Sequence, residues 1–257
     1  MKKYFFRIMV ICLAIFVFMP VMEVYGQELY WYCKRNKEHK QPISDSKFDF
    51  LDECGGIYVD KAHGDDNEEK VIYLTFDVGY ENGNVGKILD VMKEENIVGS
   101  FFILGNVIER NPDLVLRMAN DGHIVCNHTT NHPNLVGKSE ETFKNEVLGL
   151  ENEYRKLTGK EMAKFFRPPQ GTFDRKMLER AQGLGYKTVF WSFAYADWDN
   201  DKQMDEEVAL KKILDNVHNG EIMLLHPTSA TNAKIMKKLI QTLKEQGYSF
   251  ATLDKIM

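Results

Sequence analysis

Residues 71–79, VIYLTFDVG, join an apolar run that is typical of a buried strand to a carboxylate and a turn. Further strand-like runs follow along the chain: GSFFIL, HIVCN, KFFRP, KTVFWS, EIMLL and YSFATL. Helical stretches lie between them, the clearest at 139–157, where apolar residues recur on one stripe, and at 205–217, which ends just before Asn219 and Gly220. Strands that alternate with helices predict a parallel sheet covered by helices.

The placement of the polar residues decides between an open doubly wound sheet and a barrel. Each unusual polar residue comes at or just beyond the C-terminal end of a strand-like run: Asp77, His128, His132, Arg167, Asp197 and His226. In a (β/α) barrel, this end of the strands is the catalytic rim. The sequence therefore predicts an α/β fold, a distorted (β/α) barrel with about seven parallel strands.

The composition is that of an ordinary globular protein. The chain has 257 residues, of which 44% are hydrophobic and 28% charged, and its formal net charge is −5. A negative charge gives no electrostatic reason to expect a nucleic-acid ligand. The chain has no glycine-rich phosphate loop and no internal repeat, and nothing in it predicts a protein partner.

The N-terminus has the pattern of a secretory signal. Basic residues at positions 2, 3 and 7 precede an apolar run from Ile8 to Met22, and small Gly26 precedes a polar segment. This order predicts a signal peptide at 1–26, cleaved near Gly26. The mature protein is then expected to be secreted or to work in the cell-wall space. An uncleaved membrane anchor and a buried core helix are the alternatives.

The predicted mature chain divides into an extension at 27–68 and a domain at 69–257. The extension is polar and irregular, with scattered aromatic residues. Its two cysteines, Cys33 and Cys54, could close a short loop through a disulfide in an oxidising compartment. Cys126 lies in a strand-like run and is expected to be a buried thiol.

Each candidate site residue also has a purely structural interpretation. Asp77 could cap a helix, His226 could be a core histidine, and Trp198 could be a packing residue. His128 and His132 follow a strand and lie four residues apart, a spacing at which two imidazoles can reach one metal ion. A zinc site, however, usually takes three or four ligands from the protein.

Taken together, the motifs resemble the NodB-homology polysaccharide deacetylases, carbohydrate esterase family 4. Five short motifs carry the resemblance: TFDVG at 75–79, HTTNHP at 128–133, RPPQG at 167–171, DW at 197–198 and LLH at 224–226. The resemblance extends over roughly 71–257. It implies a distorted (β/α) barrel, which agrees with the pattern of strands.

The resemblance also implies catalytic roles. Amide hydrolysis needs a base to activate water and an acid to protonate the leaving amine. Asp77 matches the base of the family, and Arg167 matches the cation that keeps this carboxylate ionised. His226 matches the acid, and Asp197 matches the carboxylate that raises the pKa of the imidazole.

Substrate contacts are implied at three further positions. The backbone N–H near Gln170 matches the donor that stabilises the oxyanion of the tetrahedral intermediate. Trp198 and Leu224 match the residues that line the slot for the acetyl methyl group.

The metal site departs from the common pattern of the family. His128 and His132 match two ligands of a divalent metal, expected to be zinc. In most of the family, a second aspartate follows the base and supplies the third ligand, but Val78 occupies that position here. The resemblance therefore implies either weak metal binding with extra water or a contribution from Asp77.

Two departures narrow the subfamily. Val78 stands where the family usually has an aspartate, and Gln170 stands where an aromatic residue is usual. With these two residues and the sequence of its extension, the chain resembles the spore-cortex deacetylases, which act on N-acetylmuramic acid before the muramic δ-lactam forms. Loss of a charge and of an aromatic ring from the rim would favour an anionic, bulkier sugar. The expected substrate is therefore N-acetylmuramic acid in peptide-stripped peptidoglycan strands, and the sequence leaves open whether the enzyme also closes the lactam ring.

Three other functions compete with this hypothesis. One is deacetylation of N-acetylglucosamine in peptidoglycan or chitin-like glycans. Another is glycoside hydrolysis with Asp77 and Asp197 as the two carboxylates, which would leave the histidines and Arg167 without a role. The third is a non-catalytic protein that binds wall glycan, because Val78 weakens the metal site. Acetate release from a purified glycan separates deacetylation from glycoside hydrolysis and from non-catalytic binding.

Overall fold

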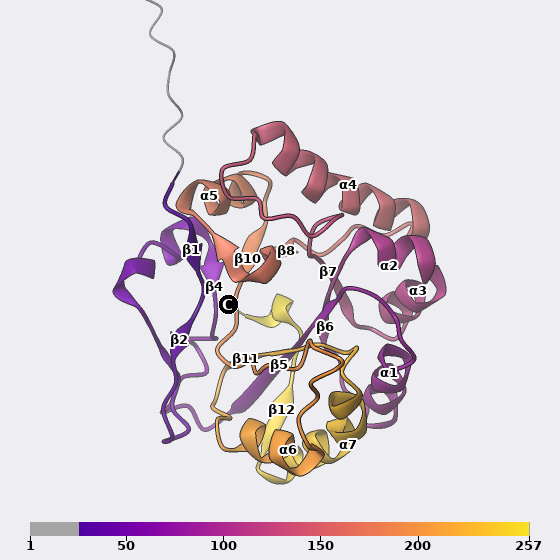
Figure 1. Cartoon of the computed structure of the whole chain (residues 1–257). Helices are drawn as coiled ribbons and strands as arrows, with labels where there is room; N and C mark the ends of the chain where they lie inside the picture. The colour runs from indigo at the N-terminus through magenta and orange to yellow at the C-terminus, as the bar shows by residue number, and fades with distance from the viewer. Residues whose placement is uncertain (1–25, 257) are drawn as a thin grey trace, which may run out of the picture.

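The computed structural model describes residues 26–256, which form a distorted (β/α) barrel (Figure 1). The predicted signal peptide therefore falls, apart from Gly26, outside the described residues. Within 26–256 no helix is both long and apolar enough to cross a membrane.

The main sheet has eight strands, and all their pairings are parallel, in the order β11-β5-β6-β7-β8-β10-β4, with β12 also paired to β5. The strands are β4 (Gly56–Ile57), β5 (Lys70–Val78), β6 (Ser100–Ile103), β7 (Ile124–Asn127), β8 (Phe165–Phe166), β10 (Lys187–Val189), β11 (Glu221–Leu225) and β12 (Tyr248–Phe250). All the predicted strands are confirmed. The additional strand, β4, comes from the extension, which the sequence analysis described as irregular.

The helices lie around this sheet (Figure 1). They are α1 (Val85–Glu94), α2 (Gly105–Arg110), α3 (Pro112–Asn120), α4 (Glu140–Thr158), α5 (Arg175–Gly183), α6 (Glu206–Leu214) and α7 (Ala230–Glu245). The helix predicted at 139–157 is α4, and Ser139 caps it by accepting a hydrogen bond from the Thr142 N–H. The helix predicted at 205–217 is α6, capped by Asp205, but it ends at Leu214 because the chain turns there before β11.

The side chains of β5 point alternately into two different apolar cores. Ile72, Leu74, Phe76 and Val78 pack into a core with side chains of the outer helices, including residues of α1 and α7. Tyr73 belongs to a different core, formed with residues of the neighbouring strands. Successive side chains of a strand point to opposite faces. Asp77, at the C-terminal end of β5, therefore shares the inner face with Tyr73, and Val78 faces the helices.

The barrel is closed irregularly. Isolated bridges join Phe193 to Met223 and Val59 to Glu221, so the segments after β10 and β4 reach β11 at the other end of the sheet. The rest of the extension packs beside this junction, where Figure 1 shows the indigo β1 (Leu29–Tyr30), β2 (Cys33–Lys34) and β4 along one side. Antiparallel pairs join β1 to β9 (Thr172–Phe173) and β2 to β3 (Ile43–Ser44).

Short 3-10 turns complete the chain. They are η1 (Ser46–Phe48), η2 (Asp52–Cys54), η3 (Pro169–Gly171) and η4 (Leu253–Lys255).

The disulfide considered between Cys33 and Cys54 is absent, since both thiols are free in the structure. The Cys33 Sγ instead donates to the Ser192 carbonyl at 3.3 Å, and Cys54 is buried in a core with Phe48 and Leu51. Cys126 is buried, as expected.

Candidate active site

The C-terminal ends of the strands form one rim, and the predicted site residues meet there. A cavity of about 690 Å³ opens at this rim. Most of the predicted site residues line it: Asp77, His128, His132, Gln170, Trp198, Leu224 and His226. The other two, Arg167 and Asp197, are buried behind the lining, where each contacts one of these side chains. The structure therefore brings together all the residues predicted from the sequence.

Asp77 and Arg167 form a buried ion pair. The Arg167 Nη1 lies 2.7 Å from the Asp77 Oδ1, and its Nη2 donates to the Thr75 Oγ1 at 2.9 Å. The Arg167 Nε donates to the Val189 carbonyl at 3.1 Å and the Nη2 also to the Phe190 carbonyl at 3.3 Å, so strand β10 holds the guanidinium in place. Burial acts to raise the pKa of Asp77, but the charges of Arg167 and the nearby imidazoles outweigh it and lower the pKa. Asp77 is therefore ionised at neutral pH and suited to accept a proton.

His226 and Asp197 form the second pair. The His226 Nδ1 lies 2.7 Å from the Asp197 Oδ1, and the backbone N–H of His226 donates to the Oδ2 at 2.8 Å. Asn232 donates to the same Oδ2 at 2.6 Å. Burial acts to lower the pKa of His226, but the hydrogen bond and charge of Asp197 outweigh it and raise the pKa. His226 is therefore suited to hold a proton, and its Nε2 has no partner within residues 26–256.

The two histidines of the predicted metal site lie side by side. Their ring centroids are 4.9 Å apart, and the His128 Nε2 lies 3.6 Å from the Asp77 Oδ2. The His128 Nδ1 lies 2.8 Å from the Arg167 carbonyl, which leaves the Nε2 as the available ring nitrogen. Burial lowers the pKa of His128 to about 4 and also lowers that of His132. Both imidazoles are neutral at pH 7, the form that binds a metal.

The donor set for a metal is nevertheless incomplete. Within residues 26–256, no group of three or more His, Cys, Asp or Glu side chains is arranged to hold a metal ion. Val78, at the position of the family's third ligand, supplies no donor atom, and its side chain is fully buried in the outer core and does not line the cavity.

The RPPQG segment forms the wall next to the histidines. It ends in η3, where Gln170 has φ 60° and ψ 9° and Gly171 has φ +66°. A Cβ on Gly171 would lie 2.7 Å from the Cη2 of Trp191, so only glycine permits this close approach. The side chain of Gln170 is exposed at the cavity, as expected if its backbone faces the substrate.

Aromatic and aliphatic side chains supply apolar surface to the cavity. Trp198 is 60% exposed, and its ring centroid lies 6.0 Å from that of His226. Leu224 is buried at the base of the cavity. Trp191 and Tyr195 also line the cavity, although the sequence analysis singled out neither. Trp191 was hidden within an apolar strand-like run, and no local motif marks Tyr195.

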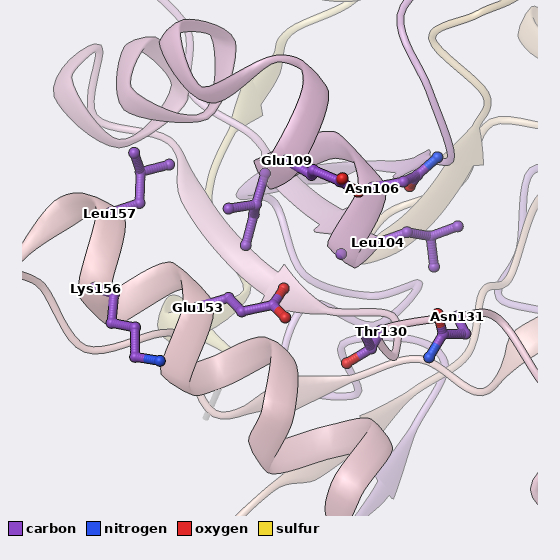
Figure 2. Close-up of a pocket in the computed structure, with 10 residues that line it drawn as sticks. Leu104, Asn106, Glu109, Thr130, Asn131, Glu153, Lys156 and Leu157 are labelled. Atoms are coloured by element: carbon purple, nitrogen blue, oxygen red, sulfur yellow. The ribbon is translucent and has the colours of Figure 1, made fainter.

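A second cleft lies between α2, α4 and the loop at Thr130 and Asn131 (Figure 2). Its volume of about 810 Å³ exceeds that of the cavity at the rim. Figure 2 shows Glu153 of α4 pointing into this cleft, but no histidine lines it and none of the predicted catalytic residues does. The predicted catalytic residues therefore lie in the smaller cavity, where the Asp77 carboxylate pairs with Arg167 and the His226 imidazole pairs with Asp197.

Comparisons with known proteins identify the family of the chain. A family model described as polysaccharide deacetylase matches residues 64–189. The chain is 37% identical over 232 residues to the peptidoglycan-N-acetylmuramic acid deacetylase PdaA of Bacillus subtilis, a match covering 90% of this chain and 87% of the relative. It is 34% identical over 186 residues to a peptidoglycan-N-acetylglucosamine deacetylase of Bacillus cereus, covering 71% of this chain and 66% of the relative.

The solved structures place the fold in the same group. The structure of Bacillus subtilis PdaA, described as a family 4 carbohydrate esterase, superimposes with a TM-score of 0.84 at 36% identity. That match covers 90% of this chain and 97% of the solved chain. The distorted barrel predicted from the sequence is thereby confirmed. The chain belongs to the polysaccharide deacetylases of carbohydrate esterase family 4 and is a hydrolase.

Proposed function

We propose that this protein is a secreted de-N-acetylase that hydrolyses the acetamide of N-acetylmuramic acid in peptide-stripped peptidoglycan. The observation that carries the proposal is the extent of the match to PdaA. A match of 232 residues is longer than the predicted domain at 69–257, so it continues into the N-terminal extension. The match to the N-acetylglucosamine deacetylase covers only 71% of this chain. The predicted signal peptide supports a location outside the cytoplasm, and we propose the spore cortex as the site of action.

The geometry supports hydrolysis with a separate base and acid. Ionised Asp77 takes a proton from water, and the water oxygen bonds to the acetyl carbon. The backbone N–H at Gln170 stabilises the oxyanion that forms. Protonated His226 then gives its proton to the sugar nitrogen as the C–N bond breaks, which releases acetate and a free amine. Closure of the amine onto the lactyl carboxyl, with loss of water, would form the δ-lactam in a later step.

The preference for muramic acid has a specific test. Among residues 26–256, no lysine or arginine lines the cavity, so N–H donors and open space, rather than an ion pair, would accommodate the lactyl carboxylate. We expect mass spectrometry of peptide-stripped glycan, digested after treatment with the protein, to show loss of acetyl groups from muramic residues. Chitin oligomers should be poor substrates. Loss confined to glucosamine residues would contradict the choice of sugar and leave the deacetylase assignment intact.

Metal binding is expected to be weak. Deacetylases of this family generally need a metal, and here His128 and His132 would hold it. A bound ion would help to polarise the acetyl carbonyl. Two imidazoles are fewer ligands than a typical zinc site has. We expect calorimetric titration with Zn²⁺ to show binding weaker than at a three-ligand site, and His128→Ala to abolish it. His39→Ala, which removes an imidazole outside the cavity, is the control and should bind as the parent does. Unchanged binding by His128→Ala would place the ion elsewhere.

A further inference from the structure

The first strand of the N-terminal extension lies directly behind the active-site wall. Strand β1 pairs with β9, which follows the RPPQG segment, with Leu29 opposite Phe173 and Tyr30 opposite Thr172. The next residue, Trp31, continues this contact, because its backbone N–H donates to the Gly171 carbonyl at 2.9 Å. The extension therefore touches the turn that is expected to supply the oxyanion donor.

The side chain of Trp31 reaches a second segment of the wall. Its Nε1–H donates to the Trp191 carbonyl at 2.8 Å. Gly171 and Trp191 are themselves in close contact, since a Cβ on Gly171 would lie 2.7 Å from the Trp191 ring. Trp31 thus donates a hydrogen bond to both Gly171 and Trp191, and both of these residues line the cavity.

A further contact leads from Trp31 to the catalytic ion pair. The ring of Trp31 stacks on that of Phe190, with centroids 4.7 Å apart and an angle of 28° between the planes. The carbonyl of Phe190 accepts a hydrogen bond from Arg167, the partner of Asp77. The extension also contacts Phe190 through β4, because the Phe190 N–H donates to the Ile57 carbonyl at 2.7 Å.

The turn at Gln170 needs such support. Gln170 adopts a left-handed backbone conformation, with φ 60°, that is strained for a residue with a side chain. Strained conformations of this kind persist only where the surrounding structure determines them. Trp31 is 7% exposed and fixed by two hydrogen bonds, so it is well placed to provide that constraint.

We propose that Trp31 is a positioning residue for deacetylation, which sets the Gln170–Gly171 turn and the Trp191 wall relative to Asp77. The N-terminal extension is then part of the active site rather than an appendage to the domain. This inference rests on the proposed function for its kinetic consequence. Its structural consequence, the ordering of the turn, is independent of substrate.

The test removes the indole hydrogen bond and keeps an aromatic side chain. Trp31→Phe keeps an aromatic ring and the backbone N–H but loses the donor to Trp191. We expect its kcat for acetate release to fall roughly tenfold with KM within about twofold of the parent, because a small misplacement of catalytic groups acts mainly on the reaction step. Trp31→His, which keeps a ring N–H, should recover part of the loss. Tyr30→Ala is the matched control on the same strand, since Tyr30 is 60% exposed and does not line the cavity.

All variants are compared at a temperature at which circular dichroism shows them fully folded. Amide hydrogen exchange of the peptide spanning 167–173 provides a second readout that needs no substrate. Faster exchange in Trp31→Phe, with parent-like exchange in Tyr30→Ala, is expected. A Trp31→Phe protein with parent-like kcat and parent-like exchange would overturn the inference, even if its melting temperature were lower. Failure of the parent to release acetate would instead overturn the proposed function, and the exchange comparison would still decide the role of Trp31.

Discussion

Replacing Asp77 with asparagine should lower the rate of acetate release by roughly 10²–10⁴, the usual range for a general base. Asparagine has nearly the same shape but cannot accept the proton of the attacking water. The pKa of Asp77 is held below its ordinary value by Arg167 and the imidazoles, so the parent carries the ionised base throughout the neutral range. Acetate release at saturating glycan measures the loss directly.

The same substitution should also destabilise the fold, which calls for a control. Arg167 is fully buried, and removing one partner of a buried ion pair costs about 3–5 kcal/mol. Asp77 has a lowered pKa in the folded state, so its stabilisation is present above its ordinary pKa of 3.8 and is lost as the pH falls below that value. Urea unfolding at pH 7 checks that Asp77→Asn remains folded in the assay. Asp199→Asn, at a partly exposed carboxylate paired with Lys202, should have parent-like activity. Near-parent turnover of folded Asp77→Asn would remove Asp77 from the mechanism.

Replacing His226 with alanine should also lower turnover by roughly 10²–10⁴, because the leaving amine then has no acid to protonate it. Asp197 raises the pKa of His226, so the active imidazolium persists to a higher pH than a free histidine would allow. Asp197→Asn should lower this pKa. The basic limb of the pH profile of kcat/KM should therefore move to lower pH, and the variant should lose more activity relative to the parent at pH 8 than at pH 6.

The pH dependence distinguishes an acid from a structural histidine. If His226 only packed against Trp198, Asp197→Asn could reduce the activity by a similar factor at every pH. A basic limb at the same pH in the parent and in Asp197→Asn would therefore contradict the role of His226 as the proton donor. Asp199→Asn again serves as the control, since Asp199 lies two residues from Asp197 but is partly exposed and does not contact the imidazole.

Much of the fold and site could be predicted because each long-range feature has a local signature. The strands of the barrel appear in the sequence as apolar runs, and Asp77 and His226 each come at the end of such a run. Because the C-terminal ends of barrel strands form one rim, the two residues could be predicted to lie at the same site. The side chain of Val78 could also have been placed by the alternation of β5. If Asp77 faces inward, its neighbour faces outward.

The role of the extension could not be read from local pattern. Strand β4 has only two residues, too few for any periodicity, and its pairing with β10 joins positions more than a hundred residues apart. The contacts of Trp31 with Gly171 and Trp191 likewise depend on the folded chain alone. The thiols of Cys33 and Cys54 were considered as a pair from their proximity in sequence, but the folded extension directs Cys33 toward the Ser192 carbonyl.

The most direct test of the account is the acetate released from purified, peptide-stripped peptidoglycan by the parent protein and by Asp77→Asn, assayed side by side with Zn²⁺ supplied. We predict that the parent releases acetate in step with the appearance of free amines on the glycan, and that Asp77→Asn stays near background. Binding of glycan by the parent without acetate release would indicate a non-catalytic wall-binding protein. Release of shorter glycan chains without acetate would indicate a glycoside hydrolase, and either result would contradict the account.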